Sequence, residues 1–176
     1  ALCLLFCLPA AALSPQSAAE DLSEAAMFRG TDQGLELSRT PKRSEAAVML
    51  VRLYGAEEEA LALYENGDLI QPFEDGNNWA APYLAWLYSR GLVKGMSETQ
   101  YGVNLPCKAG DYALFLLRAL GYQDGVDFDW AETKAFAEAH GFYPDGLFGR
   151  TFTRGDLALM TWFALQSDCA DGSGTL

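Results

Sequence analysis

The chain has 176 residues, half of which are hydrophobic, and its formal net charge at pH 7 is −12. This length is enough for one compact domain of roughly 150 residues with a hydrophobic core. The negative charge disfavours a general affinity for nucleic acid or for an anionic membrane surface, although it does not exclude an anionic ligand at a local basic spot.

The N-terminus has the composition of a signal peptide. The first eight residues, ALCLLFCL, are apolar and uncharged, and small residues follow at Ala10, Ala12, Ser17 and Ala19. We expect residues 1–19 to be part of a signal peptide that is cleaved after Ala12 or Ala19, which predicts a secreted protein. The apolar run is far shorter than the about 20 residues that a membrane-spanning helix needs.

Few residues in the chain could bind a metal ion. After signal cleavage the cysteines are Cys107 and Cys169, enough for one optional disulfide, and His140 is the single histidine. Such a set is too small and too dispersed for a structural zinc site. We therefore expect neither a metal ion nor another cofactor.

Three related segments follow one another along the chain. The first, GTDQGLELSRTPKRSEAAVMLVRLYG (30–55), aligns with GMSETQYGVNLPCKAGDYALFLLRALG (95–121), and LFGRTFTRGDLALMTWFAL (147–165) is a looser third copy. Each copy contains an apolar helix pattern with an acidic residue near its start. These acidic residues are Glu45, Asp111 and Asp156. Repeats of this size cannot bury their apolar faces alone, so we expect them to pack together.

An additional helix is expected before each of these segments. In the second copy it runs from Trp79 to Gly91, because glycine adopts the left-handed conformation of a helix C-terminus without a Cβ penalty. In the third copy it lies within residues 127–142, which include Trp130, and in the first copy within the shorter stretch 18–28, which has no tryptophan. Each unit is therefore predicted to be a helix, an irregular loop and a second helix.

The second helices of the first and third copies have recognisable start signals. Thr40 followed by Pro41 predicts an N-cap and a favoured proline at the first helical position. Thr153 and Asp156 have the spacing of a capping box, in which the hydroxyl and the carboxylate each accept a backbone N–H. The second copy has no comparable cap.

The order of these motifs resembles the S-layer homology domain. The resemblance is carried by Phe73-x-Asp75, Trp79 and WLYSRGLVKG in the second copy, and by TPKRSEAAVMLVRL and FTRGDLAL, which are similar to the Thr-Arg-Ala-Glu region of that family. It covers roughly residues 18–165. It implies an all-α fold in which three helix-loop-helix repeats form a pseudo-threefold helical prism.

The repeats set the expected boundaries along the chain. We expect a glutamate-rich stretch, residues 57–65, to be a solvated helix or linker face between the first two repeats. The expected segments are a partial signal peptide (1–19), a first repeat with a truncated first helix (20–62), a second repeat (72–122), a compressed third repeat (126–166) and a flexible tail (167–176).

The resemblance implies a non-catalytic anchoring module of bacterial cell-surface proteins, located at the cell wall or S-layer and not inserted in the membrane after signal cleavage. In that family, grooves between repeats bind an acidic, pyruvylated secondary cell wall polysaccharide attached to peptidoglycan. An aromatic residue stacks on the sugar, a basic residue binds the carboxylate and a glycine allows close approach. Carried over to this sequence, the glycan-binding residues are Arg43, Asp75, Trp79, Lys94, Gly95, Asp129, Trp130 and Arg154.

Other interpretations of the same residues stay open. Trp79 and Trp130 could be core residues, and Arg43 and Arg154 could be solvated or paired with the capping acids. The second repeat has Ala109 at the basic motif position, which favours an extracellular protein-interaction scaffold that has lost glycan binding. A glycoside hydrolase would need two carboxylates across a sugar cleft, whereas the acids here recur at equivalent places in each repeat, which is typical of an architectural role.

Overall fold

A computed structural model describes residues 13–147 and 149–176, and in this part of the chain the fold is all-helical. The α-helices are α1 (Pro15–Glu24), α2 (Arg43–Leu53), α3 (Glu57–Glu65), α4 (Ala81–Ser89), α5 (Ala109–Ala119), α6 (Thr133–Ala139) and α7 (Arg154–Ala164). Two short 3₁₀ helices are η1 (Glu74–Gly76) and η2 (Trp130–Glu132). The described residues form isolated β-bridges but no strand, which confirms the all-α prediction.

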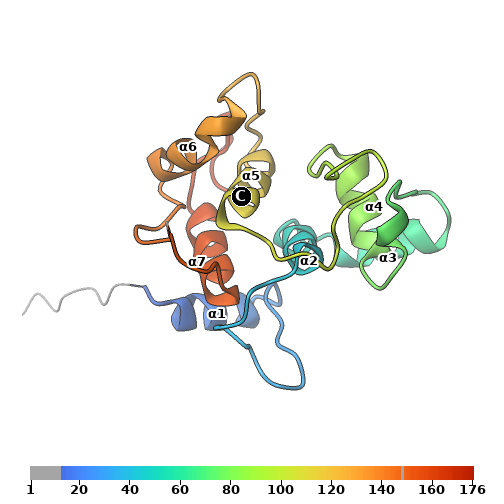
Figure 1. Ribbon diagram of the computed structural model, residues 1–176, viewed down its shortest axis with the longest axis horizontal. Coiled ribbons are helices and arrows are strands. Elements are labelled where there is room, and N and C mark those ends of the chain that lie inside the picture. The colour runs from blue at the N-terminus through green and yellow to red at the C-terminus, as the bar shows by residue number, and fades with distance from the viewer. Residues whose placement is uncertain (1–12, 148) are drawn as a thin grey trace, which may run out of the picture.

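The packing of the helices follows the predicted repeats. In the predicted division into repeats, α1, α4 and α6 are the first helices, and α2, α5 and α7 are the second helices. Helix α4 packs on α2, α6 packs on α5, and α1 packs on α7, while α5 contacts both α2 and α7 (Figure 1). Each first helix therefore lies against the second helix of the preceding repeat. The circuit closes because the first helix of the first repeat lies against the second helix of the third.

The hydrophobic core runs through the three second helices. Their apolar residues recur every three or four positions, which places one face of each helix toward the others. Leu50 of α2, Leu116 of α5 and Met160 of α7 are almost completely buried. Tyr112 and Thr161 join α5 to α7 inside this core through a hydrogen bond between their hydroxyl oxygens, which lie 2.5 Å apart. Burial of one such large apolar side chain contributes about 1.5–3 kcal/mol.

Two predicted helix boundaries are confirmed. Thr153 is the N-cap of α7: its N–H donates to the Asp156 carboxylate (2.9 Å), and its hydroxyl oxygen accepts the Asp156 N–H (3.3 Å). Helix α4 ends at Ser89, and Gly91 follows with φ of 68°. This left-handed conformation favours glycine, which explains why the helix stops there.

The predicted start of α2 is wrong. The helix begins at Arg43, so Thr40 is not its N-cap and Pro41 is not its first residue. Lys42 occupies the N-cap position, and its backbone N–H donates to Glu45 Oε2 (2.7 Å). The acidic residue of the first repeat therefore caps the helix without help from a hydroxyl group.

Helix α1 crosses the predicted end of the signal peptide. Most of the predicted signal, residues 1–12, lies outside the described residues. Ala18, Ala19 and Leu22 are buried in α1, which packs on α7. Cleavage after Ala19 would cut this helix, whereas cleavage after Ala12 would leave it whole. The first repeat also has a full first helix, since α1 has 10 residues and α4 has 9, so the expected truncation is corrected.

The last ten residues pack against the C-terminal end of α5. The Ala170 N–H donates to the Leu120 carbonyl oxygen (2.8 Å), and the Tyr122 hydroxyl donates to the Asp168 carbonyl oxygen (3.3 Å). Cys169 lies in this segment and is not bonded to Cys107. The segment expected to be a flexible tail, 167–176, is thus held by hydrogen bonds to the preceding fold.

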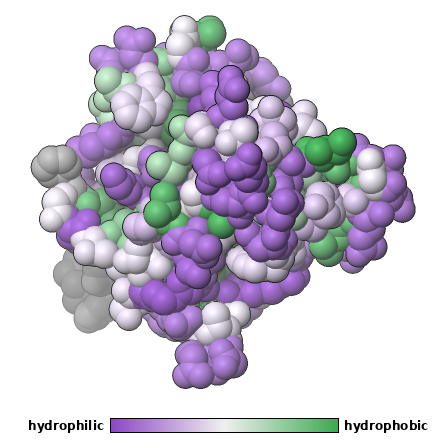
Figure 2. Space-filling view, turned by 45° about the vertical axis from the view of Figure 1, so that its right-hand side comes forward, coloured by the Kyte–Doolittle hydropathy of each residue, from purple (hydrophilic) through white to green (hydrophobic). Residues whose placement is uncertain are grey.

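The surface is mostly hydrophilic on the face shown in Figure 2, where hydrophobic residues form small separate groups. This distribution agrees with the high net charge of the chain. Large exposed apolar residues include Ile70, Val126, Trp79 and Trp130. An exposed tryptophan is the most informative of these, because tryptophan side chains are highly buried on average.

Candidate functional site

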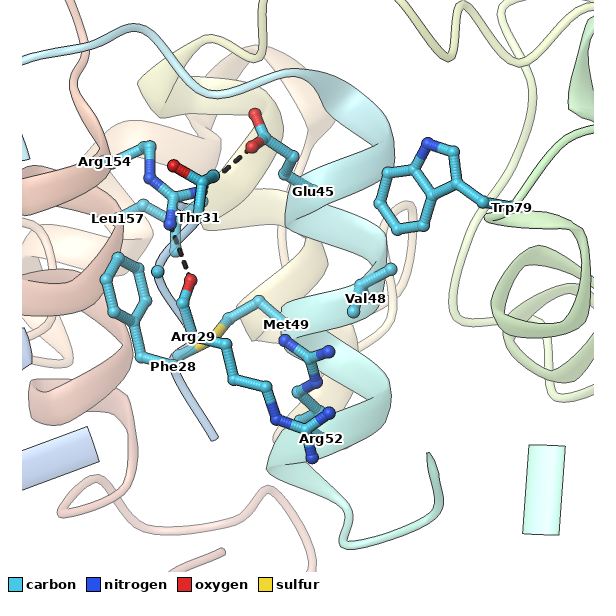
Figure 3. Close-up of a pocket in the computed structure, with 11 residues that line it drawn as sticks. Phe28, Arg29, Thr31, Glu45, Val48, Met49, Arg52, Trp79, Arg154 and Leu157 are labelled. Atoms are coloured by element: carbon cyan, nitrogen blue, oxygen red, sulfur yellow. Dashed lines mark hydrogen bonds and ion pairs between the residues drawn. The ribbon is translucent and has the colours of Figure 1, made fainter. Parts of the chain in front are cut away.

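A groove of about 320 Å³ lies where parts of all three predicted repeats meet. It is formed by the loop after α1, one face of α2, the segment before α4 and the first turn of α7 (Figure 3). We call it the Trp79 groove. Its polar and aromatic lining includes Arg29, Arg52, Arg154, Glu45, Trp79 and Phe28. The remaining lining residues are apolar or small, apart from Thr31.

Trp79 forms an aromatic wall of this groove. It precedes α4, is 61% exposed, and points toward α2 from the side away from Arg154 and Phe28 (Figure 3). Its ring meets the Tyr83 ring edge-on, with the centroids 6.4 Å apart. Trp130, the corresponding residue of the third repeat, is 70% exposed. The interpretation of these two tryptophans as core residues is therefore wrong, and the exposed Trp79 indole lines the groove.

Arg154 lines the groove but is already engaged by the protein. Its Nη1 donates to Glu45 Oε1 (2.9 Å), its Nη2 to the Arg29 carbonyl oxygen (2.8 Å) and its Nε to the Leu35 carbonyl oxygen (3.1 Å). The guanidinium also lies over the Phe28 ring, 4.8 Å from its centroid. Arg154 of the third repeat thus fixes both the acid and the interhelical loop of the first repeat.

Arg43 of the first repeat has the same role toward the second repeat. It is buried, its Nε donates to the Tyr101 carbonyl oxygen (3.0 Å), and its Nη1 lies 3.3 Å from Asp111 Oδ2. The alternative in which Arg43 and Arg154 pair with the capping acids is confirmed, with the acid supplied by another repeat.

The two pairs described so far each join one predicted repeat to the next, whereas the acid of the third repeat is paired within its own repeat. Ala109 stands where the second repeat would supply an arginine, and Asp156 instead pairs with Arg150 of its own repeat, 2.6 Å away. A related cavity of about 610 Å³ is lined by Lys108, Ala109 and Arg150. No tryptophan is among the described residues that line it.

Asp75 stabilises a loop of the second repeat through hydrogen bonds. Its carboxylate accepts the backbone N–H groups of Tyr101 (2.8 Å), Gly102 (2.7 Å) and Val103 (3.0 Å). Burial alone would raise the pKa of Asp75, but these three hydrogen bonds outweigh it and the pKa is lowered. Asp75 does not line the Trp79 groove.

Lys94 and Gly95 follow α4 and also lie outside the Trp79 groove. Lys94 Nζ is 3.1 Å from Asp124 Oδ2. A Cβ atom at Gly95 would clash with the Ser97 carbonyl oxygen, and would lie 2.6 Å from the Phe73 ring and 2.8 Å from the Gln100 carbonyl oxygen. The close approach that we predicted for Gly95 is therefore made by other residues of the same chain, Phe73, Ser97 and Gln100.

Replacement of Gly95 by alanine should lower the free energy of unfolding by about 1–3 kcal/mol, because the added methyl group must displace backbone atoms. Gly110→Ala is the matched control: this glycine lies in the first turn of α5, and a Cβ atom there would meet nothing within 4 Å. That change should stabilise the protein by up to about 1 kcal/mol. Urea denaturation measures both, and equal stability of the two variants would contradict this account of Gly95.

The remaining predicted residues, Asp129 and Trp130, are exposed and do not line the Trp79 groove. Of the eight predicted glycan-binding residues, the groove contains Trp79 and Arg154. The other predicted residues are Arg43, Asp75, Lys94, Gly95, Asp129 and Trp130, and for them a glycan contact stays a prediction.

Two residues that line the groove, Arg29 and Arg52, were not predicted from the sequence as site residues. Both pair with Glu57 of α3: Arg29 Nη2 lies 2.6 Å from Oε2, and Arg52 Nη2 lies 3.0 Å from Oε1. Glu57 also accepts the Tyr83 hydroxyl (2.9 Å), so this part of the glutamate-rich stretch is not the solvated face that we expected. Burial opposes the shift, but these hydrogen bonds and charges lower the pKa of Glu57.

The alignment of the repeats could have indicated the pairing of Arg52 with Glu57. Arg52 aligns with Arg118, and each of these two residues precedes an acid by a few positions. In the second repeat, Asp124 pairs with Arg118 (3.0 Å) and with Lys94 (3.1 Å) in the same way. These residues line a cavity of about 360 Å³, which no tryptophan lines among the residues that the structure describes.

One continuous stretch of chain supplies Asp75, Trp79, Lys94 and Gly95 and continues into the first turns of α5. Residues 72–113 match the S-layer homology domain. This stretch corresponds to most of the second predicted repeat. An S-layer homology domain is a non-catalytic module and implies anchoring at the cell surface through binding to the cell wall. No curated protein matches the chain.

None of the helices within residues 13–147 and 149–176 is long and apolar enough to cross a membrane. The S-layer homology domain suggests a location at the cell surface.

Proposed function

We propose that the Trp79 groove binds an anionic secondary cell wall polysaccharide and thereby anchors the protein to the cell wall. One observation carries the proposal: an exposed indole and three arginines line the same groove in a chain of net charge −12. The apolar face of an indole suits a sugar ring, and guanidinium groups bind carboxylates with two parallel hydrogen bonds. The local positive charge at the groove then outweighs the overall negative charge.

The proposed ligand is acidic, pyruvylated and attached to peptidoglycan, as the resemblance to the family implies. The proposed location is the cell wall or S-layer, after cleavage of the signal peptide. We also propose that the three repeats form a pseudo-threefold prism. The closed circuit of helix contacts supports this arrangement, as do the equivalent pairs Arg43–Asp111 and Arg154–Glu45.

Replacement of Trp79 by alanine tests this proposal. The variant should bind purified wall polysaccharide roughly tenfold more weakly, because loss of a stacking surface costs about 1.4 kcal/mol. Trp130→Ala is the matched control, since it removes an equally exposed tryptophan that does not line the groove. Calorimetric titration measures the affinities, and circular dichroism confirms the fold.

Unchanged affinity in Trp79→Ala would contradict the assignment of the ligand to this groove. A loss confined to Trp130→Ala would move the glycan site to the third repeat.

A further inference from the structure

The three arginines of the Trp79 groove differ in what they already bind. Each nitrogen of Arg154 donates to a protein acceptor, and its side chain is only 6% exposed. Its partner Glu45 is also bound by Arg39, which in turn pairs with Glu36 (3.3 Å). Two positive and two negative side chains therefore meet at this end of the groove. Their charges balance, and Arg154 acts as a structural residue.

At the opposite end of the groove, positive side chains outnumber negative ones. Arg29 and Arg52 share a single carboxylate, that of Glu57. Both Nε and Nη2 of Arg52 donate to Glu57 Oε1, at 3.1 and 3.0 Å, while the Arg29 side chain stays 53% exposed. Figure 3 shows the side chains of Arg29 and Arg52 gathered at the end of the groove away from Glu45. This cluster has one more positive than negative charge.

The same cluster is connected to the aromatic wall. The Tyr83 hydroxyl donates to Glu57 Oε1 (2.9 Å), and the Tyr83 ring contacts Trp79. Glu57 thus holds the two guanidinium groups from one side, while its partner Tyr83 supports the indole. A ligand that stacks on Trp79 would meet a cation pair belonging to the same connected unit.

We propose that Arg29 and Arg52 hold the anionic group of the ligand, while Trp79 packs against an adjacent sugar ring. This inference rests on the proposed function and assigns charge recognition to residues other than Arg154. The single surplus charge suits a singly charged anion such as a sugar carboxylate, and a phosphate ester offers the same hydrogen-bond acceptors.

Calorimetric titration with purified wall polysaccharide tests the assignment. Arg29→Gln and Arg52→Gln should each weaken binding about tenfold, and the affinity of each variant should depend less on salt concentration than that of the wild type. Lys134→Gln is a control with the same change of charge: this lysine lies on α6, pairs with Glu138 and does not line the groove. It should bind like the wild type.

Two modified polysaccharides identify the anion. Chemical reduction of the carboxyl groups should weaken wild-type binding at least tenfold and weaken Arg52→Gln binding less, because this variant has already lost one of the two guanidinium groups that bind the carboxylate. Enzymatic removal of phosphate should change neither; the reverse pattern would identify a phosphate.

The outcomes also separate this inference from the proposed function. If Trp79→Ala weakens binding but both arginine variants bind like the wild type, the groove is a glycan site and the cation assignment is wrong. If the wild type fails to bind any of the polysaccharides, the proposed function fails, and the assignment fails with it.

Discussion

Arg154→Ala should lower the free energy of unfolding by about 3–5 kcal/mol, the usual range when one partner of a buried ion pair is removed. The Arg154 guanidinium joins α7 to the first repeat through Glu45 and through the carbonyl oxygens of Arg29 and Leu35. Its removal leaves these acceptors with fewer donors in a region that water reaches poorly. Because Arg39 still pairs with Glu45, we expect a value near the lower end of the range.

Arg90→Ala is the comparison for this experiment. Arg90 also forms an ion pair, with Glu59 at 2.9 Å, but both side chains are substantially exposed. An exposed pair contributes about 0–1 kcal/mol. Urea denaturation of both variants measures the difference. A change of less than 1 kcal/mol in Arg154→Ala would show that this contact between the first and third repeats contributes little to stability.

Asp75→Ala should lower the free energy of unfolding by about 2–4 kcal/mol, because three backbone N–H groups lose a charged acceptor. These groups belong to Tyr101, Gly102 and Val103, in the loop that leads toward α5. Asp129→Ala serves as the control, since Asp129 is an exposed acid in the corresponding segment of the third repeat. Its removal should change stability by less than about 0.5 kcal/mol.

The pH dependence of stability gives a second measurement for Asp75. Its pKa is lower in the folded state than the ordinary value of about 3.9, so its contribution is fully present above that value. The contribution is lost as the pH falls through the folded pKa, because protonation then favours the unfolded chain. The difference in stability between wild type and Asp75→Ala should therefore shrink below about pH 4. A difference that is constant from pH 7 to pH 2 would contradict the role of the carboxylate.

Local patterns predicted where the second helices lie, but not the residue at which α2 begins. Their apolar spacing, the Thr153 capping box and the end of α4 before Gly91 depend on residues close together in sequence. The same reasoning failed for Trp79, which we expected to be the first residue of this helix. Helix α4 begins only at Ala81, so Trp79 lies outside the helical register and is free to point into the groove.

The partners of each helix and of each arginine could not be read from local patterns. The resemblance placed Trp79 and Arg154 among the site residues, and the structure places both in one groove. Arg52 looked like an ordinary polar residue in the last turn of an apolar helix. Its importance comes from Arg29, which lies in a distant segment and meets it only in the folded chain, and from Glu57, five positions further along.

Co-sedimentation with peptidoglycan sacculi tests the central claim, anchoring through the wall polysaccharide, most directly. The wild-type chain is mixed with sacculi that carry the covalently attached polysaccharide and with sacculi from which it has been removed. We expect the chain to sediment with the first preparation, to stay in solution with the second, and to be released from the first by high salt. Equal sedimentation with both preparations, or with neither, would contradict the account and favour an extracellular protein-interaction scaffold.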